Sequence, residues 1–197
     1  MNLEHFAPRN KQECRAQLDL PRASRIIVTV AHLGHRKGHH EMIQALAGLP
    51  EDVQLVIVGG AAQGGTTEQL KGIARGKGVE DRLILPGPQP YARIPLYFSA
   101  ADVSVLASYR EGCPNAVLEA LASGTPVVAT DVGAVPDILP ETVGRIVPPE
   151  QVEPLRNAVA EVLDKNWDAK QVINDSGVRS WEQVAEEVRD VFHNLMI

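Results

Sequence analysis

The 197-residue chain has few aromatic residues, only two cysteines and no excess of basic charge. Aromatic residues make up 4% of the chain, so its core has to be built from Val, Ile, Leu and Ala, which favour buried parallel strands. The net charge of −6 argues against non-specific nucleic-acid binding, which needs a basic surface. Cys14 and Cys113 match no zinc or redox spacing.

The sequence also lacks an apolar run long enough to cross a bilayer, and no secretory signal follows Met1. We therefore expect a cytoplasmic, reduced protein. The length suits one α/β domain, and the 44% of hydrophobic residues suffices for a sizeable core. We treat residues 1–197 as this one domain, with a linker segment at about 1–20 and terminal helices at about 151–197.

Apolar runs alternate with helix-like segments, which predicts a Rossmann-like α/β fold: a parallel sheet with helices on both faces. The loops after the strands then share one edge of the sheet, where such folds bind ligands. The expected strands are 25–31, 53–60, 82–85, 102–107, 125–130 and 143–147. The expected helices are 38–47, 66–75, 94–100, 152–164, 168–174 and 181–195, with one more starting at Pro114.

The stretch from Glu111 to Glu119 is the most informative part of the chain. Pro114 suits the first position of a helix, whose free amides at 115–117 and dipole favour an anion such as a phosphate. Glu119, inside the helix, is placed to bind a ribose diol, and Glu111 is free to meet sugar hydroxyls. Either glutamate alone is more often an ordinary solvated acid. The complete run predicts a site for a phosphorylated sugar or a nucleotide.

At residues 111–135 the sequence resembles the donor-site signature of retaining glycosyltransferases with the GT-B fold, the large family 4 group. The signature consists of two glutamates separated by seven residues, then Gly-x-Pro-Val-Val-Ala and a Val-Gly-Gly-x-Pro-Glu segment. Further matching segments follow the family order along nearly the whole chain: Phe6-Ala7-Pro8, the loop 31–38, Val132 to Asp137, and Ser180-Trp181-Glu182.

The resemblance implies that the chain is the donor-binding half of a GT-B enzyme and binds a nucleotide sugar without a metal or other cofactor. It implies that Lys37, with Glu111, is catalytic and helps to neutralise the diphosphate. The family also has an arginine for that task, and here His32 occupies its position, with Arg36 as a possible substitute. The remaining donor-binding residues implied are Glu119, Gly59, Leu85, Gly87, Gly112, Cys113, Pro114, Asn115 and Ala116.

Two groups of residues invite other interpretations. His32, His35, His39 and His40 suggest a metal site, but their spacing fits no ligand pattern, so we expect none. The glycine-rich loop at 59–65 does not have the GxGxxG spacing of a dinucleotide fold, and its glycines are weak evidence on their own.

A GT-B enzyme needs a second, acceptor-binding domain, for which the five residues before Phe6 leave no room. We therefore expect a chain that binds a donor but barely transfers its sugar alone, and any membrane contact only through the other domain. The apolar stripe of the last helix, which contains Trp181 and Phe192, should be partly exposed. A hexosyl transferase using UDP- or GDP-linked donors in polysaccharide biosynthesis is the first hypothesis. A nucleotide-sugar epimerase half-domain and a non-catalytic nucleotide-binding module are the alternatives.

Overall fold

The computed structural model describes residues 1–62 and 65–195, in which six parallel strands form one sheet in the order β3-β2-β1-β4-β5-β6. The strands are β1 (Arg25–Val30), β2 (Val53–Val58), β3 (Leu83–Gly87), β4 (Val103–Leu106), β5 (Val127–Thr130) and β6 (Gly144–Val147). Strand order reverses between β1 and β4, which are paired through Ile27↔Val103 and Val28↔Ser104. This is the order of a doubly wound α/β fold, so the predicted fold class is confirmed.

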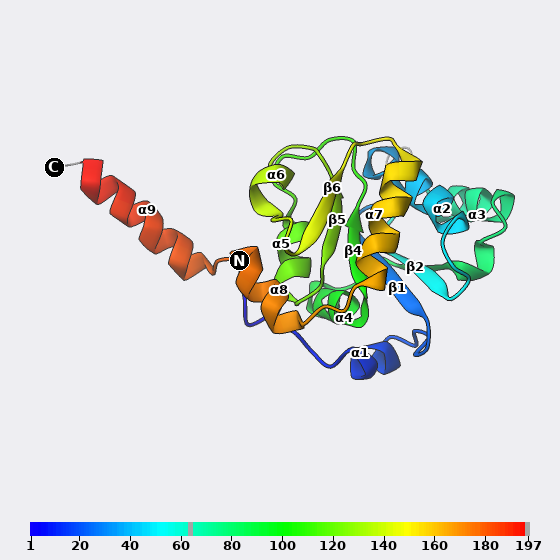
Figure 1. Ribbon diagram of the computed structural model, residues 1–197, viewed down its shortest axis with the longest axis horizontal. Coiled ribbons are helices and arrows are strands. Elements are labelled where there is room, and N and C mark those ends of the chain that lie inside the picture. The colour runs from blue at the N-terminus through cyan, green and yellow to red at the C-terminus, as the bar shows by residue number, and fades with distance from the viewer. Residues whose placement is uncertain (63–64, 196–197) are drawn as a thin grey trace.

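Helices cover both faces of the sheet (Figure 1). Alternate strand residues point to opposite faces: Ile26 and Val28 join one buried cluster, and Ile27 joins the other. One face carries α2 (His39–Ala47), α3 (Thr67–Gly76) and α7 (Val152–Asp164). The other carries α4 (Ile94–Ala100), α5 (Asn115–Ala122), α6 (Val135–Ile138) and α8 (Ala169–Ser176), with α1 (Lys11–Gln17) against α4.

Most of the expected elements are present within one or two residues of their predicted ends, and β3 shows where local reasoning was wrong. We expected this strand to stop at Leu85 because of Pro86, yet it continues to Gly87. A proline lacks a ladder donor, but β3 lies at the edge of the sheet, where a missing donor can face away from the neighbouring strand. The paired register shifts between Val56 and Val58 at this point.

The segment at 1–20 is more than a linker, because it contains helix α1 and contributes to the core. The Asn10 side chain caps α1 by accepting the N–H groups of Gln12 and Glu13. Arg15 is 3% exposed and its guanidinium donates to the Ala100 carbonyl at 2.9 Å and to the Asp102 carboxylate at 2.7 Å. Phe6 is buried in the same cluster as the α4 helix.

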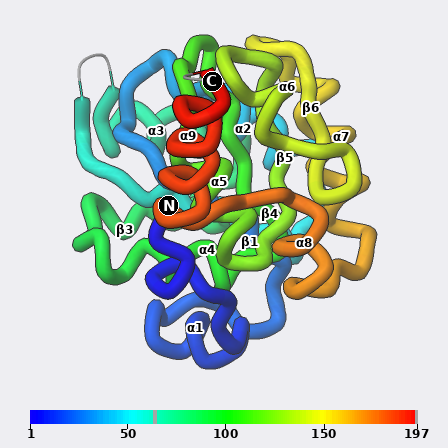
Figure 2. The backbone as a smooth tube through the Cα atoms, turned by 90° about the vertical axis from the view of Figure 1, so that its left-hand side faces the viewer, coloured from blue at the N-terminus to red at the C-terminus, as the bar shows by residue number. Residues whose placement is uncertain are grey.

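Helix α9 (Trp181–Leu195) projects away from this body (Figure 1). Figure 2 shows the N-terminus beside its first turn, where the Trp181 N–H donates to the Met1 carbonyl at 3.2 Å. No residue of α9 is buried in the described chain, and Trp181 and Phe192 are 66% and 62% exposed. The prediction of an exposed apolar stripe is therefore confirmed. Across the described residues, no helix has both the length and the hydropathy that a bilayer span requires.

Candidate functional site

The loops after β1 and β4 lie side by side at the point where the strand order reverses. The Tyr109 N–H donates to the Arg36 carbonyl at 2.9 Å, which joins the two loops. The carboxyl ends of parallel strands at such a reversal usually form the ligand-binding crevice, so these two loops are the first candidate for a binding site.

An ion pair crosses this reversal point. Lys37 Nζ lies 2.6 Å from Glu111 Oε1, and the two side chains are only 19% and 13% exposed. The structure thus brings together the two predicted catalytic residues, which are 74 positions apart in the sequence. An ammonium and a carboxylate held together in a partly desolvated loop offer a cation for phosphate oxygens and an acceptor for hydroxyl groups.

The position of Lys37 depends on the glycine that follows it. Gly38 has φ +67°, and a Cβ at this position would lie 1.9 Å from the Ala107 carbonyl oxygen. Residues His35–Lys37 form a 3₁₀ turn, and α2 starts only at His39 rather than at Gly38 as expected. The left-handed backbone of Gly38 is what separates the turn from the helix.

His39 fixes the backbone of the same loop from inside. Its Nε2 lies 3.0 Å from the His32 carbonyl oxygen, and the residue is 1% exposed. Burial lowers the pKa of His39 to about 4, so at neutral pH the ring is uncharged and donates through Nε2. The His32 ring is exposed, and its Nδ1 accepts the Gly34 N–H at 3.1 Å.

The other histidines of the loop do not gather around one point. His35 packs on His40 and on Tyr109, whose hydroxyl donates to Glu41 at 2.7 Å. Burial and this hydrogen bond raise the pKa of Tyr109. Among the described residues, no three His, Cys, Asp or Glu side chains are arranged to hold a metal ion.

The loop of Glu111 rests on a second glycine turn. Gly133 has φ +56°, and a Cβ there would lie 2.4 Å from the carbonyl oxygens of Glu111 and Gly112. The Ala134 N–H donates to the Gly112 carbonyl at 2.8 Å. The turn at Gly133 and Ala134 therefore supports the loop that holds Glu111.

Helix α5 has free backbone N–H groups in its first turn, but not all of the three that the sequence predicted are free. Pro114 precedes the helix with ψ 104° and is not its first residue, so the expectation for Pro114 was wrong. The Val117 N–H donates to the Pro114 carbonyl at 3.1 Å and is not free. The N–H groups of Asn115 and Ala116 meet no acceptor within the described parts of the chain.

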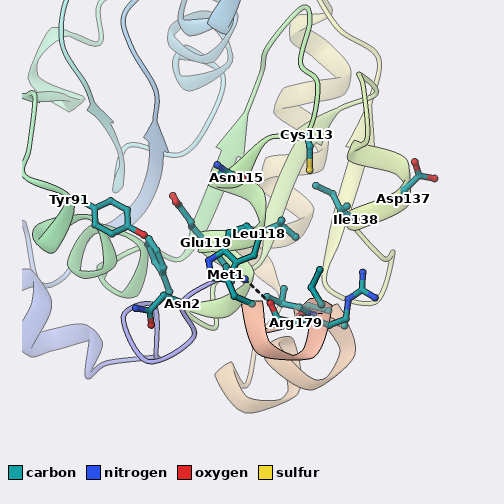
Figure 3. A pocket seen from close by; sticks show the side chains of 16 residues that line it. Met1, Asn2, Tyr91, Cys113, Asn115, Leu118, Glu119, Asp137, Ile138 and Arg179 are labelled. Carbon is teal, nitrogen blue, oxygen red and sulfur yellow. Dashed lines mark hydrogen bonds between the residues drawn. The ribbon is translucent and has the colours of Figure 1, made fainter. Parts of the chain in front are cut away.

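A cavity of about 400 Å³ opens on the outer side of α5 (Figure 3). Three predicted residues line it: Cys113, Asn115 and Glu119. Glu119 is half-buried, and loss of solvent raises the pKa of its carboxyl. The cavity continues past Asp137 toward Arg179 and Trp181 at the start of α9.

Other predicted residues lie outside this cavity. Lys37, Glu111, His32 and Arg36 belong to the strand-reversal loops, so the site has two parts that adjoin through residues 111–113. Gly59 and Gly87 join the ends of β2 and β3, because the Gly59 N–H donates to the Gly87 carbonyl at 3.1 Å. Leu85 is half-buried within β3. Gln63 and Gly64 of the glycine-rich loop lie outside the described residues.

Tyr91 is one of the cavity-lining residues that the sequence reasoning missed. It follows β3 in the turn Tyr91–Arg93 and lines the cavity together with Glu119. Its position after a strand, at the same sheet edge as the other loops, was a signal in a chain with so few aromatic residues.

Known proteins resemble this chain over most of its length. Residues 10–177 match the model of the family described as glycosyl transferases group 1. The chain belongs to this family. It is 28% identical over 193 residues to a D-inositol 3-phosphate glycosyltransferase of Mycobacteroides abscessus, covering 95% of this chain and 43% of that protein.

Two solved structures extend the comparison. Sucrose-phosphate synthase from Thermosynechococcus elongatus superposes with a TM-score of 0.82 and 29% identity over 100% of this chain and 51% of that one. HepE of Anabaena, crystallised with UDP, gives a TM-score of 0.75 at 21% identity, covering 96% of this chain and 56% of that chain. The glycosyltransferase group 1 chain described here therefore spans about half the length of these proteins, and its sheet is one half of a GT-B fold.

Proposed function

We propose that this chain is the donor-binding half of a retaining family 4 glycosyltransferase, which transfers a hexosyl group from a nucleotide sugar to an acceptor held by another domain. The observation that carries the proposal is the Lys37–Glu111 pair at the strand reversal, adjoining the free amides of Asn115 and Ala116. A cation and helix-start amides on neighbouring loops suit the diphosphate of such a donor.

Each group has a task in this proposal. Lys37 and the two amides stabilise the negative charge that grows on the diphosphate as its bond to the anomeric carbon breaks. Glu111 holds the Lys37 ammonium in place and accepts a hydroxyl of the donor sugar. Glu119 accepts the ribose diol from the cavity side of α5. The anomeric carbon then forms its new bond to an acceptor oxygen, and the proton of that hydroxyl passes to the departing diphosphate.

A UDP-linked hexose is the first donor that we propose, and a GDP-linked hexose is the second. Uridine nucleotides are supported by the HepE structure, which was crystallised with UDP. We propose no metal or other cofactor, because the charges needed for a diphosphate come from Lys37, the α5 amides and Arg36. The acceptor domain, any membrane contact through it, a cytoplasmic location and a role in polysaccharide biosynthesis belong to the same proposal.

One observation keeps a second candidate open: the residue in the arginine position is His32. Its Nδ1 is used by the Gly34 N–H, so the neutral ring has one N–H to offer and no permanent charge. A non-catalytic nucleotide-binding module would tolerate this weaker diphosphate contact. Transfer by the parent protein from a labelled nucleotide sugar, with the anomeric configuration read by NMR, separates a retaining transferase from this module and from an epimerase.

Donor binding itself is testable on the chain as it stands. Calorimetric titration with UDP and GDP should give saturable binding, which Lys37→Met weakens about tenfold or more because a charge-assisted contact is lost. Glu119→Gln should weaken nucleotide binding but leave inorganic pyrophosphate unaffected. The exposed Lys77 at the end of α3 provides the control, and Lys77→Met should bind like the wild type. Unchanged binding by both site variants would refute the site assignment.

A further inference from the structure

Tyr91 is held in place although most of its side chain faces solvent. The residue is 60% exposed. His5 stacks on it with ring centroids 4.5 Å apart and planes 14° apart, and Phe6 meets it edge-on at 5.6 Å. The His5 Nε2 also lies 3.2 Å from the Tyr91 carbonyl oxygen. The ring is therefore an ordered aromatic surface with one face covered by His5.

This surface shares the cavity with the carboxylate proposed for the ribose. Figure 3 shows Tyr91 at the rim, with Glu119 and Asn115 beside it on α5. The two groups are close enough that Glu119 helps, after burial, to raise the pKa of the Tyr91 hydroxyl. In any nucleoside the base is joined to the same small ring as the diol, so a residue next to the diol-binding group meets the base.

Two carbonyl groups at the end of β3 are already hydrogen-bonded within the domain. The Pro86 carbonyl accepts the Gln89 side chain at 3.0 Å, and the Gly87 carbonyl accepts the Gly59 N–H at 3.1 Å. Pro86 has no N–H to donate. Tyr91 adds a flat aromatic face to this side of the cavity.

We propose that Tyr91 is the platform on which the nucleobase of the donor stacks, with His5 fixing its ring. This inference rests on the proposed function and adds the part of the site that binds the base. Since every base has a π-face, stacking on Tyr91 gives affinity with little discrimination between bases. The site should then accept both purine and pyrimidine diphosphates, with the larger purine face bound somewhat more tightly.

The alternative is that Tyr91 only anchors residues 5 and 6 to the domain. Both roles require the ring, but only the stacking role depends on the presence of a base in the ligand. Inorganic pyrophosphate is the probe that separates them, because it fills the diphosphate position and has no base.

The experiment measures calorimetric affinities of the full chain for ADP, UDP and pyrophosphate. It compares the wild type with the variants Tyr91→Ala, Tyr91→Phe, His5→Ala, Lys37→Met and Phe192→Ala. Phe192 is a matched exposed aromatic residue on α9 and does not line the cavity. We expect Tyr91→Ala to weaken ADP about tenfold, UDP somewhat less, and pyrophosphate not at all. Tyr91→Phe, which keeps the ring, and Phe192→Ala should match the wild type. His5→Ala should give a smaller loss than Tyr91→Ala.

Two results would overturn the platform while leaving the proposed function intact: ADP affinity unchanged in Tyr91→Ala while Lys37→Met weakens it, or an equal loss for ADP and pyrophosphate. The second result would show that the ring has only an anchoring role. If the wild-type chain binds ADP and UDP no more tightly than pyrophosphate, both the platform and the proposed function fail. Both also fail if the chain binds none of the three.

Discussion

The strand-reversal loops and helix α9 have opposite relations to the rest of the chain. In the loops, Lys37 pairs with Glu111, His39 Nε2 bonds the His32 carbonyl and Gly38 packs closely against Ala107. In α9, the apolar side chains of Trp181, Val188 and Phe192 are largely exposed. The comparison shows loops that are held together by contacts within the domain and a helix whose apolar side chains are mostly exposed in the described part of the chain.

The largest expected difference between the two regions concerns two phenylalanines. Phe98 on α4 is fully buried, and Phe98→Ala should lower the free energy of unfolding by about 3–5 kcal/mol through the cavity that it leaves. Phe192→Ala on α9 should change it by less than about 0.5 kcal/mol. Urea denaturation of both variants measures this. Equal losses would mean that α9 is packed in solution.

Acidification should destabilise the loop region through His39. Its pKa is about 4 in the folded chain, against the ordinary value of 6.5, so the unfolded chain binds more protons between these values. The stabilisation is complete above pH 6.5 and is lost as the pH falls toward 4, by about 3 kcal/mol in total.

The variant His39→Gln isolates this contribution, because an amide keeps a donor for the His32 carbonyl and cannot titrate. The free energy of unfolding of both proteins is measured from pH 7 to pH 4. The wild type should lose more stability than His39→Gln as the pH falls. His193→Gln on the exposed helix α9 is the control and should follow the wild type. A parallel pair of curves for wild type and His39→Gln would contradict a neutral, buried His39.

Two glycines with almost the same backbone test the close packing of the loops. Gly38 has φ +67° and Gly78 has φ +69°, but only Gly38 has neighbours where a Cβ would be. Gly78→Ala should cost about 1 kcal/mol from the left-handed backbone alone. Gly38→Ala should cost about 2 kcal/mol more, because the Ala107 backbone has to move. Chemical denaturation should show this order, and the reverse order would contradict the contact.

The smallest expected effect is the difference between two ion pairs. A double-mutant cycle on Lys37 and Glu111, which are largely shielded from solvent, should give a coupling of about 1 kcal/mol or more. The Arg179–Glu187 pair at the start of α9 is about half exposed and should give less than about 0.5 kcal/mol. Raising the salt concentration should reduce the second coupling more than the first.

The sequence was sufficient for most of the fold because its apolar periodicities are local. Helices α4, α7 and α9 have the predicted bounds, and the strands end within a few residues of their predicted positions. The predicted helix starts were wrong where a single glycine or proline sets the backbone conformation. Gly38 and Pro114 each stand one residue outside the helix that they were expected to begin. Helix α1 was missed, although Asn10 is a capping residue placed three positions before Glu13.

For the candidate site, the sequence determined which residue types are available, and the tertiary structure decided which of them meet. Lys37, Glu111 and Glu119 stand out in the sequence because a family pattern and a helix start surround them. The contact between Lys37 and Glu111 depends on β1 lying next to β4 in the sheet, although these two strands are far apart in the sequence. Tyr91 lines the cavity with its ring packed against His5 and Phe6, which come from the N-terminal segment. Long-range packing is set by the summed burial of many residues, and no local segment carries that information.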